Sequence, residues 1–113
     1  MARTILRTDG DTINIHDLQS FYFDAIDTII QTSTTITTTA APIPATALTY
    51  RKTILVKNSG TNTVYLGSST VTSANGYPLA AGEEKGFDLG SSAILYGVTA
   101  TGSSAVKSLE GGN

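Results

Sequence analysis

The chain has 113 residues and a net charge of −2, with 40% hydrophobic residues, 14% charged residues and no cysteine. This length suits one ordinary domain, or one small domain with an arm, and the composition is too poor in charge for a typical disordered chain. The lack of cysteine excludes disulfides and thiolate metal sites. No cluster of Lys and Arg favours nucleic acid, and no apolar run is long enough to span a membrane.

The two halves of the sequence differ in composition. Residues 1–49 carry five acidic and two basic side chains, whereas residues 50–113 carry four acidic and five basic ones. Ten of the eleven glycines follow residue 50. Because segments of such different composition tend to have different roles, we predict an N-terminal arm or anchor over residues 1–49 and a β-sandwich module over residues 50–113.

The first thirty residues indicate a hairpin followed by a helix. Residues 4–7 and 12–15 flank Asp9-Gly10, a dipeptide suited to positive φ in a tight turn. Over residues 16–30, apolar side chains recur at spacings of three and one, which is typical of an amphipathic helix. A strand is the alternative, because Phe, Tyr and Ile are only moderate helix formers. The apolar set comprises Leu18, Phe21, Tyr22, Ala25, Ile26, Ile29 and Ile30.

Residues 31–47 are biased toward threonine. They contain seven Thr, with Pro42 and Pro44, and only Ile36 and Ile43 interrupt the run with large apolar side chains. A series of β-branched residues disfavours helix, and the prolines favour an extended backbone. A flexible linker would be richer in Gly, Ser or charge, so we interpret this stretch as an extended arm that lies on a partner.

Apolar and polar residues alternate along most of the second half. The alternation predicts strands at residues 53–57, 63–67, 86–89, 93–99 and 105–109, separated by turns. The fold class is therefore mainly β, a small antiparallel β-sandwich or barrel of about five to six strands. The N-terminal arm, with its hairpin and one short helix, precedes it. Residues 110–113 are expected to bury nothing.

The inward side chains of these strands form the predicted core. A module of about 60 residues without disulfides is marginal by itself, so partner subunits are expected to supply further buried area. We therefore expect a homo-oligomer. The predicted core comprises Ile54, Val56, Val64, Leu66, Leu89, Ile94, Val98 and Val106.

No group of residues meets the requirements of a catalytic site. His16 is the single histidine, and its neighbour Asp17 need not face it, so a position on the surface or at a helix start is the better interpretation. Residues 9–11 resemble a calcium loop only superficially, because the closing glutamate is missing. Residues 83–84 pair two carboxylates in a glycine-bounded loop, as a solvated turn does. We predict no enzyme activity, no metal site and no cofactor.

Several short motifs of the second half follow one another in a familiar order. They lie at residues 52–58 (KTILVKN), 63–67 (TVYLG), 71–72 (VT), 75–79 (NGYPL), 81–83 (AGE), 87–89 (FDL) and 95–96 (LY). This series resembles a small β-sandwich module found in virion proteins of tailed bacteriophages, and it covers residues 50–110. The resemblance implies a role in capsid decoration, head fibres or another part of the virion surface, with a trimer as the first expectation for the oligomer.

These features together predict a structural virion protein of a tailed bacteriophage, foremost a capsid decoration or cement protein that stabilises the capsid surface. It would be made in the host bacterial cytoplasm, with the major capsid protein or other virion subunits as partners, and without nucleic acid or membrane. The alternatives are a receptor- or glycan-binding fibre tip and a tail or neck component. Candidate protein-contact residues are Leu18, Phe21, Ile26, Ile29, Ile30, Ile36 and Tyr77.

Overall fold

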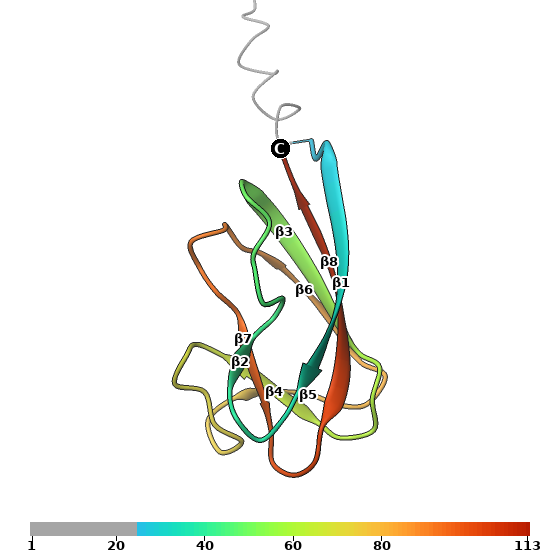
Figure 1. Cartoon of the computed structure of the whole chain (residues 1–113), viewed down its shortest axis with the longest axis vertical. Helices are drawn as coiled ribbons and strands as arrows, with labels where there is room; N and C mark the ends of the chain where they lie inside the picture. Colours follow the sequence, from blue (N-terminus) through green and yellow to red (C-terminus); the bar gives the residue numbers. More distant parts are fainter. Residues whose placement is uncertain (1–24) are drawn as a thin grey trace, which may run out of the picture.

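The computed structural model describes residues 25–113, and within them every regular element is a β-strand (Figure 1). The hairpin predicted for residues 4–15 and most of the predicted helix lie outside the described residues. The strands are β1 (Thr28–Ile36), β2 (Ala41–Pro42), β3 (Arg51–Asn58), β4 (Val64–Gly67), β5 (Tyr77–Leu79), β6 (Glu84–Asp88), β7 (Tyr96–Thr99) and β8 (Ser104–Gly112).

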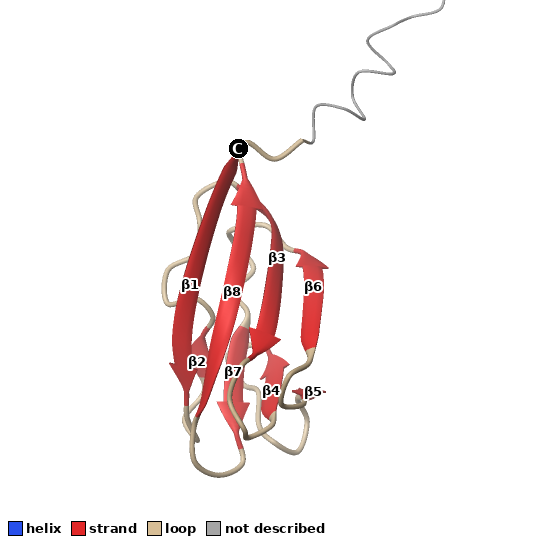
Figure 2. Cartoon of the chain, turned by 90° about the vertical axis from the view of Figure 1, so that its right-hand side faces the viewer, coloured by secondary structure: helices blue, strands red, loops and turns tan. Residues whose placement is uncertain are grey.

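The strands form two antiparallel sheets of four strands each. The first sheet has the order β1-β8-β3-β6 and the second has the order β2-β7-β4-β5. Figure 2 shows the long strands of the first sheet in front and the shorter second sheet behind their lower part. The predicted fold class, a small antiparallel β-sandwich, is confirmed, with eight strands in the described residues rather than five or six.

The helix predicted to reach residue 30 is wrong in its described part, because Thr28, Ile29 and Ile30 begin strand β1. This strand is β-branched at most of its positions and pairs with β8 along its whole length, from Thr28 opposite Gly112 to Ile36 opposite Ser104. β-branched side chains favour such a pleated surface over a helix. The alternative of a strand is therefore the one that the structure adopts.

The threonine-rich stretch is extended in part, over residues 31–36 and 41–42, and these residues lie on their own chain. Strand β1 is part of the first sheet and β2 part of the second, and Ile36 and Ile43 are among the most buried side chains. The domain boundary predicted after residue 49 is therefore wrong for the β fold, which begins at Thr28 or earlier. A sandwich that recruits these two strands also gains core area that a shorter module lacks.

The hydrophobic core lies between the two sheets. Leu89 is partly buried against it, whereas Ile94 is exposed and Val98 is buried outside the main cluster. The five remaining predicted core residues are confirmed. The core cluster comprises Ile36, Ile43, Ile54, Val56, Val64, Leu66, Leu79, Leu95 and Val106.

Strand β7 presents to the core the face opposite to the predicted one. The prediction placed Ile94 and Val98 inward, but Leu95 and Gly97 occupy the inward positions. A Cβ atom at Gly97 would lie 2.6 Å from Cδ1 of Ile43, so a larger residue there would have to displace the Ile43 side chain. A glycine at an inward position hides the alternation of apolar side chains, which explains the wrong choice of face.

Residues 110–112 are buried, contrary to the expectation that residues 110–113 bury nothing, and Asn113 is exposed. Glu110 continues β8 and forms an ion pair with Arg51 at 2.8 Å, and both side chains are almost fully inaccessible to solvent. Arg51 also donates from Nε to the carbonyl of Leu89 at 2.9 Å and from Nη2 to the carbonyl of Ala93 at 2.7 Å. The Glu110 carboxylate accepts from the backbone N–H of Leu48 at 3.0 Å. The pair thus joins β3 and β8 to two loops.

Asn58, at the end of β3, is a second buried polar centre. Its Nδ2 donates to the carbonyls of Asn62 and Leu79 at 2.8 and 2.9 Å. Its Oδ1 accepts from Gly60 N at 3.1 Å and from the Ser104 hydroxyl at 2.6 Å. All four hydrogen-bonding positions of the amide are satisfied, as a fully buried polar group requires.

Candidate functional site

The outer face of the first sheet, turned away from the core, carries three cross-strand rows of side chains. Strand registers fix each row, because residues directly opposite one another in an antiparallel ladder project to the same face. The rows are Ile29, Gly111, Thr53 and Asp88; then Gln31, Leu109, Leu55 and Gly86; then Ser33, Lys107, Lys57 and Glu84.

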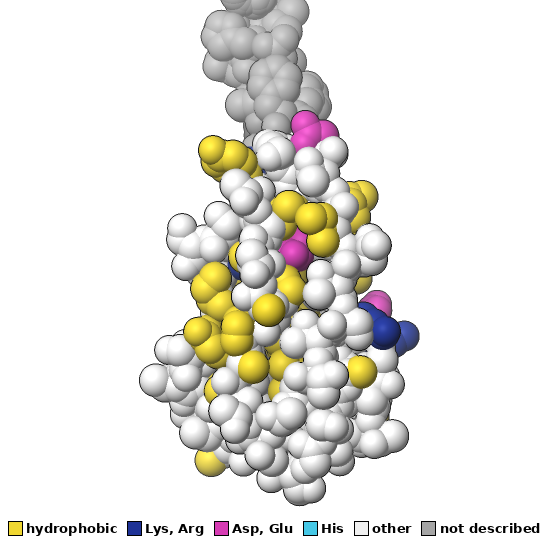
Figure 3. All heavy atoms as spheres, viewed as in Figure 1, with side chains coloured by type: hydrophobic (Ala, Val, Ile, Leu, Met, Phe, Trp, Pro, Cys, Tyr) yellow, Lys and Arg dark blue, Asp and Glu magenta, His cyan; other side chains and the backbone are white. Residues whose placement is uncertain are grey.

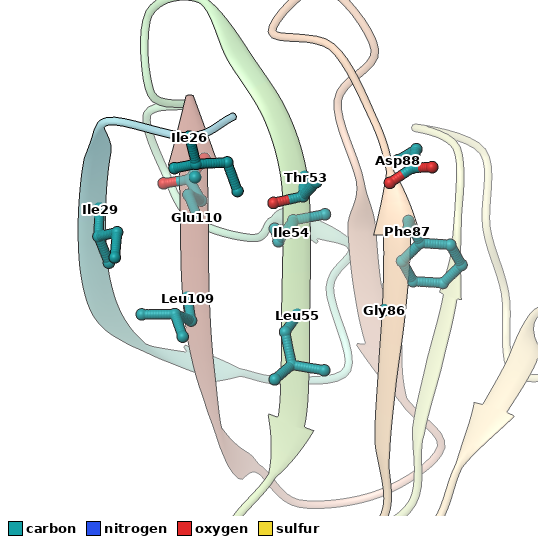
Figure 4. Close-up of a pocket in the computed structure, with 11 residues that line it drawn as sticks. Ile26, Ile29, Thr53, Ile54, Leu55, Gly86, Phe87, Asp88, Leu109 and Glu110 are labelled. Carbon is teal, nitrogen blue, oxygen red and sulfur yellow. The ribbon is translucent and has the colours of Figure 1, made fainter. Parts of the chain in front are cut away.

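A shallow apolar hollow of about 360 Å³ lies on the first two rows. Leu55 and Leu109 are direct cross-strand neighbours at its centre (Figure 4). Gly86, opposite Leu55 on β6, has no side chain, which leaves the space beside Leu55 open. Ile26 lies over the strand at Gly111, where a Cβ atom would be 2.6 Å from its Cδ1. The chain therefore enters the sandwich along one wall of this hollow.

The third row gives the hollow a charged border. Lys107 and Lys57 are opposite one another on β8 and β3, and Glu84 is opposite Lys57 on β6. Like charges directly opposite on neighbouring strands repel one another. Asp88 lies at the other end of the hollow, in the row of Thr53. A ligand with an apolar group and a carboxylate beside it would match the hollow and its lysine border.

Exposed apolar side chains concentrate on this outer face. The view in Figure 3 shows hydrophobic side chains gathered over the middle of the molecule, with few charged groups. The large apolar side chains that are exposed in the described residues are Ile26, Ile29, Ile30, Tyr50, Leu55, Tyr77, Ile94 and Leu109. Four of these, Ile26, Ile29, Leu55 and Leu109, line the one hollow.

The structure separates the predicted contact residues into three groups. Ile26 and Ile29 line the hollow, and Ile30 is exposed on the opposite face of β1. Ile36 is fully buried in the core, so its predicted role as a contact residue is wrong. It ends β1 where the second sheet covers the first, which is why it faces inward. Leu18 and Phe21 lie outside the described residues.

Tyr77 is exposed at the start of β5, and the Lys85 ammonium lies 5.3 Å from its ring centroid. It lies apart from the hollow.

Leu55 and Leu109, at the centre of the hollow, were missed. Each has a side chain on the outer face of its strand. The two residues are 54 positions apart along the chain, and only the pairing of β3 with β8 brings them together. The register of β3 with β8 would have identified them, and a single sequence does not supply that register.

The described residues hold no group of three or more His, Cys, Asp or Glu side chains that could bind a metal ion. No helix among them is long and apolar enough to cross a membrane. No protein-family model matches the sequence, and no curated protein matches it. What the outer face offers is an apolar hollow with a lysine border, a surface suited to packing against another protein.

Proposed function

We propose that this protein is a structural subunit of a tailed-bacteriophage virion, foremost a capsid decoration protein, that docks on a neighbouring subunit through the outer face of its first sheet. The observation that carries the docking function is the hollow around Leu55 and Leu109. The assignment to a virion rests on the resemblance of residues 50–110, described above, to virion β-sandwich modules.

The fold itself gives no reason for leucines on this outer face. The sandwich already has a core between its sheets, and antiparallel sheets usually present polar side chains to water. Leu55 and Leu109 are 39% and 45% exposed, and Gly86 beside Leu55 adds no side chain that would cover them. Clustered apolar groups with a polar border are typical of a surface that another protein covers.

The charged border indicates which chemistry the partner presents. Lys57 and Lys107 repel one another across β3 and β8, and a carboxylate placed between them would relieve that repulsion. The matching surface on a capsid subunit would therefore present an apolar side chain with Asp or Glu close beside it. Binding of this kind weakens as salt concentration rises, because exposed ion pairs are screened.

The test compares binding of the full-length chain and its variants to particles of the encoding phage that were prepared without this protein. Fully burying a leucine is worth about 1.5 to 3 kcal/mol, and somewhat less than half of each side chain is still exposed here. The double variant Leu55→Gln/Leu109→Gln should therefore lose about 1 to 2.5 kcal/mol, or about five- to seventyfold in affinity.

The matched control is Ile94→Gln, because Ile94 is 41% exposed but lies away from the hollow. It should bind as the unchanged chain does, and all variants should retain their far-UV circular dichroism spectra. If the leucine double variant binds particles as tightly as the control, the outer face is not the docking surface. If the unchanged chain does not bind particles at all, the virion assignment is wrong.

A further inference from the structure

The two sheets have four edge strands, and three of them are protected against pairing with another chain. Strands β2 and β5 have two and three residues and contain Pro42 and Pro78. Strand β6 has three charged residues, Glu84, Lys85 and Asp88, among its five. Short length, proline and charge are the features by which natural sheets block edge-to-edge association. These three edges are therefore unsuited to accept a further strand.

The fourth edge, β1, has none of these features. It spans nine residues, Thr28–Ile36, without a charged residue or a proline. Within residues 25–113 it pairs on one side only, with β8. In an antiparallel ladder every second residue of such an edge directs its N–H and C=O groups away from the sheet. Strand β1 thus offers an uninterrupted row of backbone donors and acceptors.

The exposure of two isoleucines points to a neighbour in the plane of the sheet. Ile29 and Ile30 lie on opposite faces of β1 and are 65% and 42% exposed. A partner that covers the outer face would contact Ile29 alone. A strand paired alongside β1 has side chains on both of its faces, so it contacts both isoleucines at once.

We infer that β1 pairs antiparallel with β1 of a second copy of this chain. A two-fold interface brings the same residues together from both sides, so it must be self-complementary. An uncharged strand meets that condition, because no like charges come opposite one another in any register. With Thr32 on the two-fold axis, the whole strand pairs, and Ile29 and Ile30 lie opposite Thr35 and Thr34 of the second copy.

This pairing would join two sandwiches through one continuous eight-stranded sheet. Because the axis is perpendicular to that sheet, the two hollows around Leu55 and Leu109 would lie on the same side of the dimer. The assembly is a dimer, in place of the trimer that the resemblance implies. The inference stands independently of the virion assignment, since it concerns only the association of the isolated chain.

The test is sedimentation equilibrium of the full-length chain, whose monomer mass is 11.7 kDa, with two charge variants at outward positions of β1. In the proposed register Gln31 lies opposite Ser33 of the second copy. Gln31→Glu/Ser33→Glu places glutamates opposite glutamates and should raise the dimer dissociation constant about tenfold. Gln31→Lys/Ser33→Glu places lysine opposite glutamate and should restore dimers. In both variants the glutamate at position 33 lies opposite Lys107 of its own chain, so this contact does not distinguish them.

A second measurement does not depend on charge. The chain has no cysteine, so Thr32→Cys introduces a single thiol that meets its copy on the axis and should give a covalent dimer on mild oxidation. Thr28→Cys is the control, because in this register its two thiols would be about 27 Å apart. A chain that stays monomeric at 100 µM would overturn the inference. So would a dimer or trimer that the paired glutamates leave intact and that Thr32→Cys does not cross-link. A concentration of 100 µM is roughly a hundredfold above a micromolar dissociation constant, so a dimer of that affinity would be populated.

Discussion

Removing either partner of the buried ion pair between Arg51 and Glu110 should destabilise the fold severely. The pair is almost fully excluded from water, and Arg51 also donates to the carbonyls of Leu89, Gly90 and Ala93. Breaking a buried pair by removing one partner typically costs about 3 to 5 kcal/mol, because the other charge remains buried without compensation. That is a large part of the total stability of a domain, which is about 5 to 15 kcal/mol.

The two single variants should differ in size of effect. Arg51→Met leaves the Glu110 carboxylate with only the N–H of Leu48 and removes the donor from three backbone carbonyls. Glu110→Leu leaves the guanidinium with three carbonyl acceptors but no counter-charge. We therefore expect Arg51→Met to be the more destabilising. The double variant should cost less than the sum of the two, with a coupling energy of about 1 to 3 kcal/mol.

Urea unfolding followed by far-UV circular dichroism measures these differences. For a chain of this size the slope is about 1.5 kcal/mol per M, so a loss of 3 to 5 kcal/mol moves the midpoint by about 2 to 3 M. Lys107→Met is the control, because it removes an exposed cation from β8, and should change stability by less than about 0.5 kcal/mol. Single variants that each cost under about 1 kcal/mol, or that add without coupling, would refute the structural role of the pair.

Three further changes test the fold. A chain that starts at Tyr50 lacks β1 and β2 and should give no cooperative urea transition. A normal transition would support the domain boundary predicted after residue 49. Gly97→Val should cost at least about 1 to 3 kcal/mol in urea unfolding, because its side chain would overlap Ile43, and an unchanged midpoint would contradict the inward position of Gly97. Asn58→Leu should cost about 2 to 4 kcal/mol by leaving buried partners unsatisfied, whereas a cost under about 0.5 kcal/mol would mean that water replaces the amide.

The parts of the fold that could be predicted from the sequence are those in which local alternation and burial agree. Strands β3 and β4 show regular apolar alternation, and Ile54, Val56, Val64 and Leu66 all lie in the core. Strand β1 was mistaken for the end of a helix because the spacing of Ile26, Ile29 and Ile30 also fits a helical period. Pairing with β8 decides between the two, and pairing is a property of the whole fold.

The candidate site depends even more on long-range pairing. Ile26 and Ile29 could be chosen from their apolar character alone, but Leu55 and Leu109 become a site only when β3 and β8 lie side by side. The burial of Glu110 has the same cause, since its partner Arg51 lies 59 positions earlier. The register between distant strands follows from the way all strands pack together, and local pattern does not determine it.

The most direct test of the proposed function is the location of this protein in the intact virion of the phage that encodes it, determined by electron cryomicroscopy. The proposal predicts density for the eight-stranded sandwich on the outer surface of the capsid. The outer face of the first sheet should lie against a capsid subunit, with an apolar side chain of that subunit in the hollow around Leu55 and Leu109. A virion without such density, or one in which this face is turned to solvent, would contradict it.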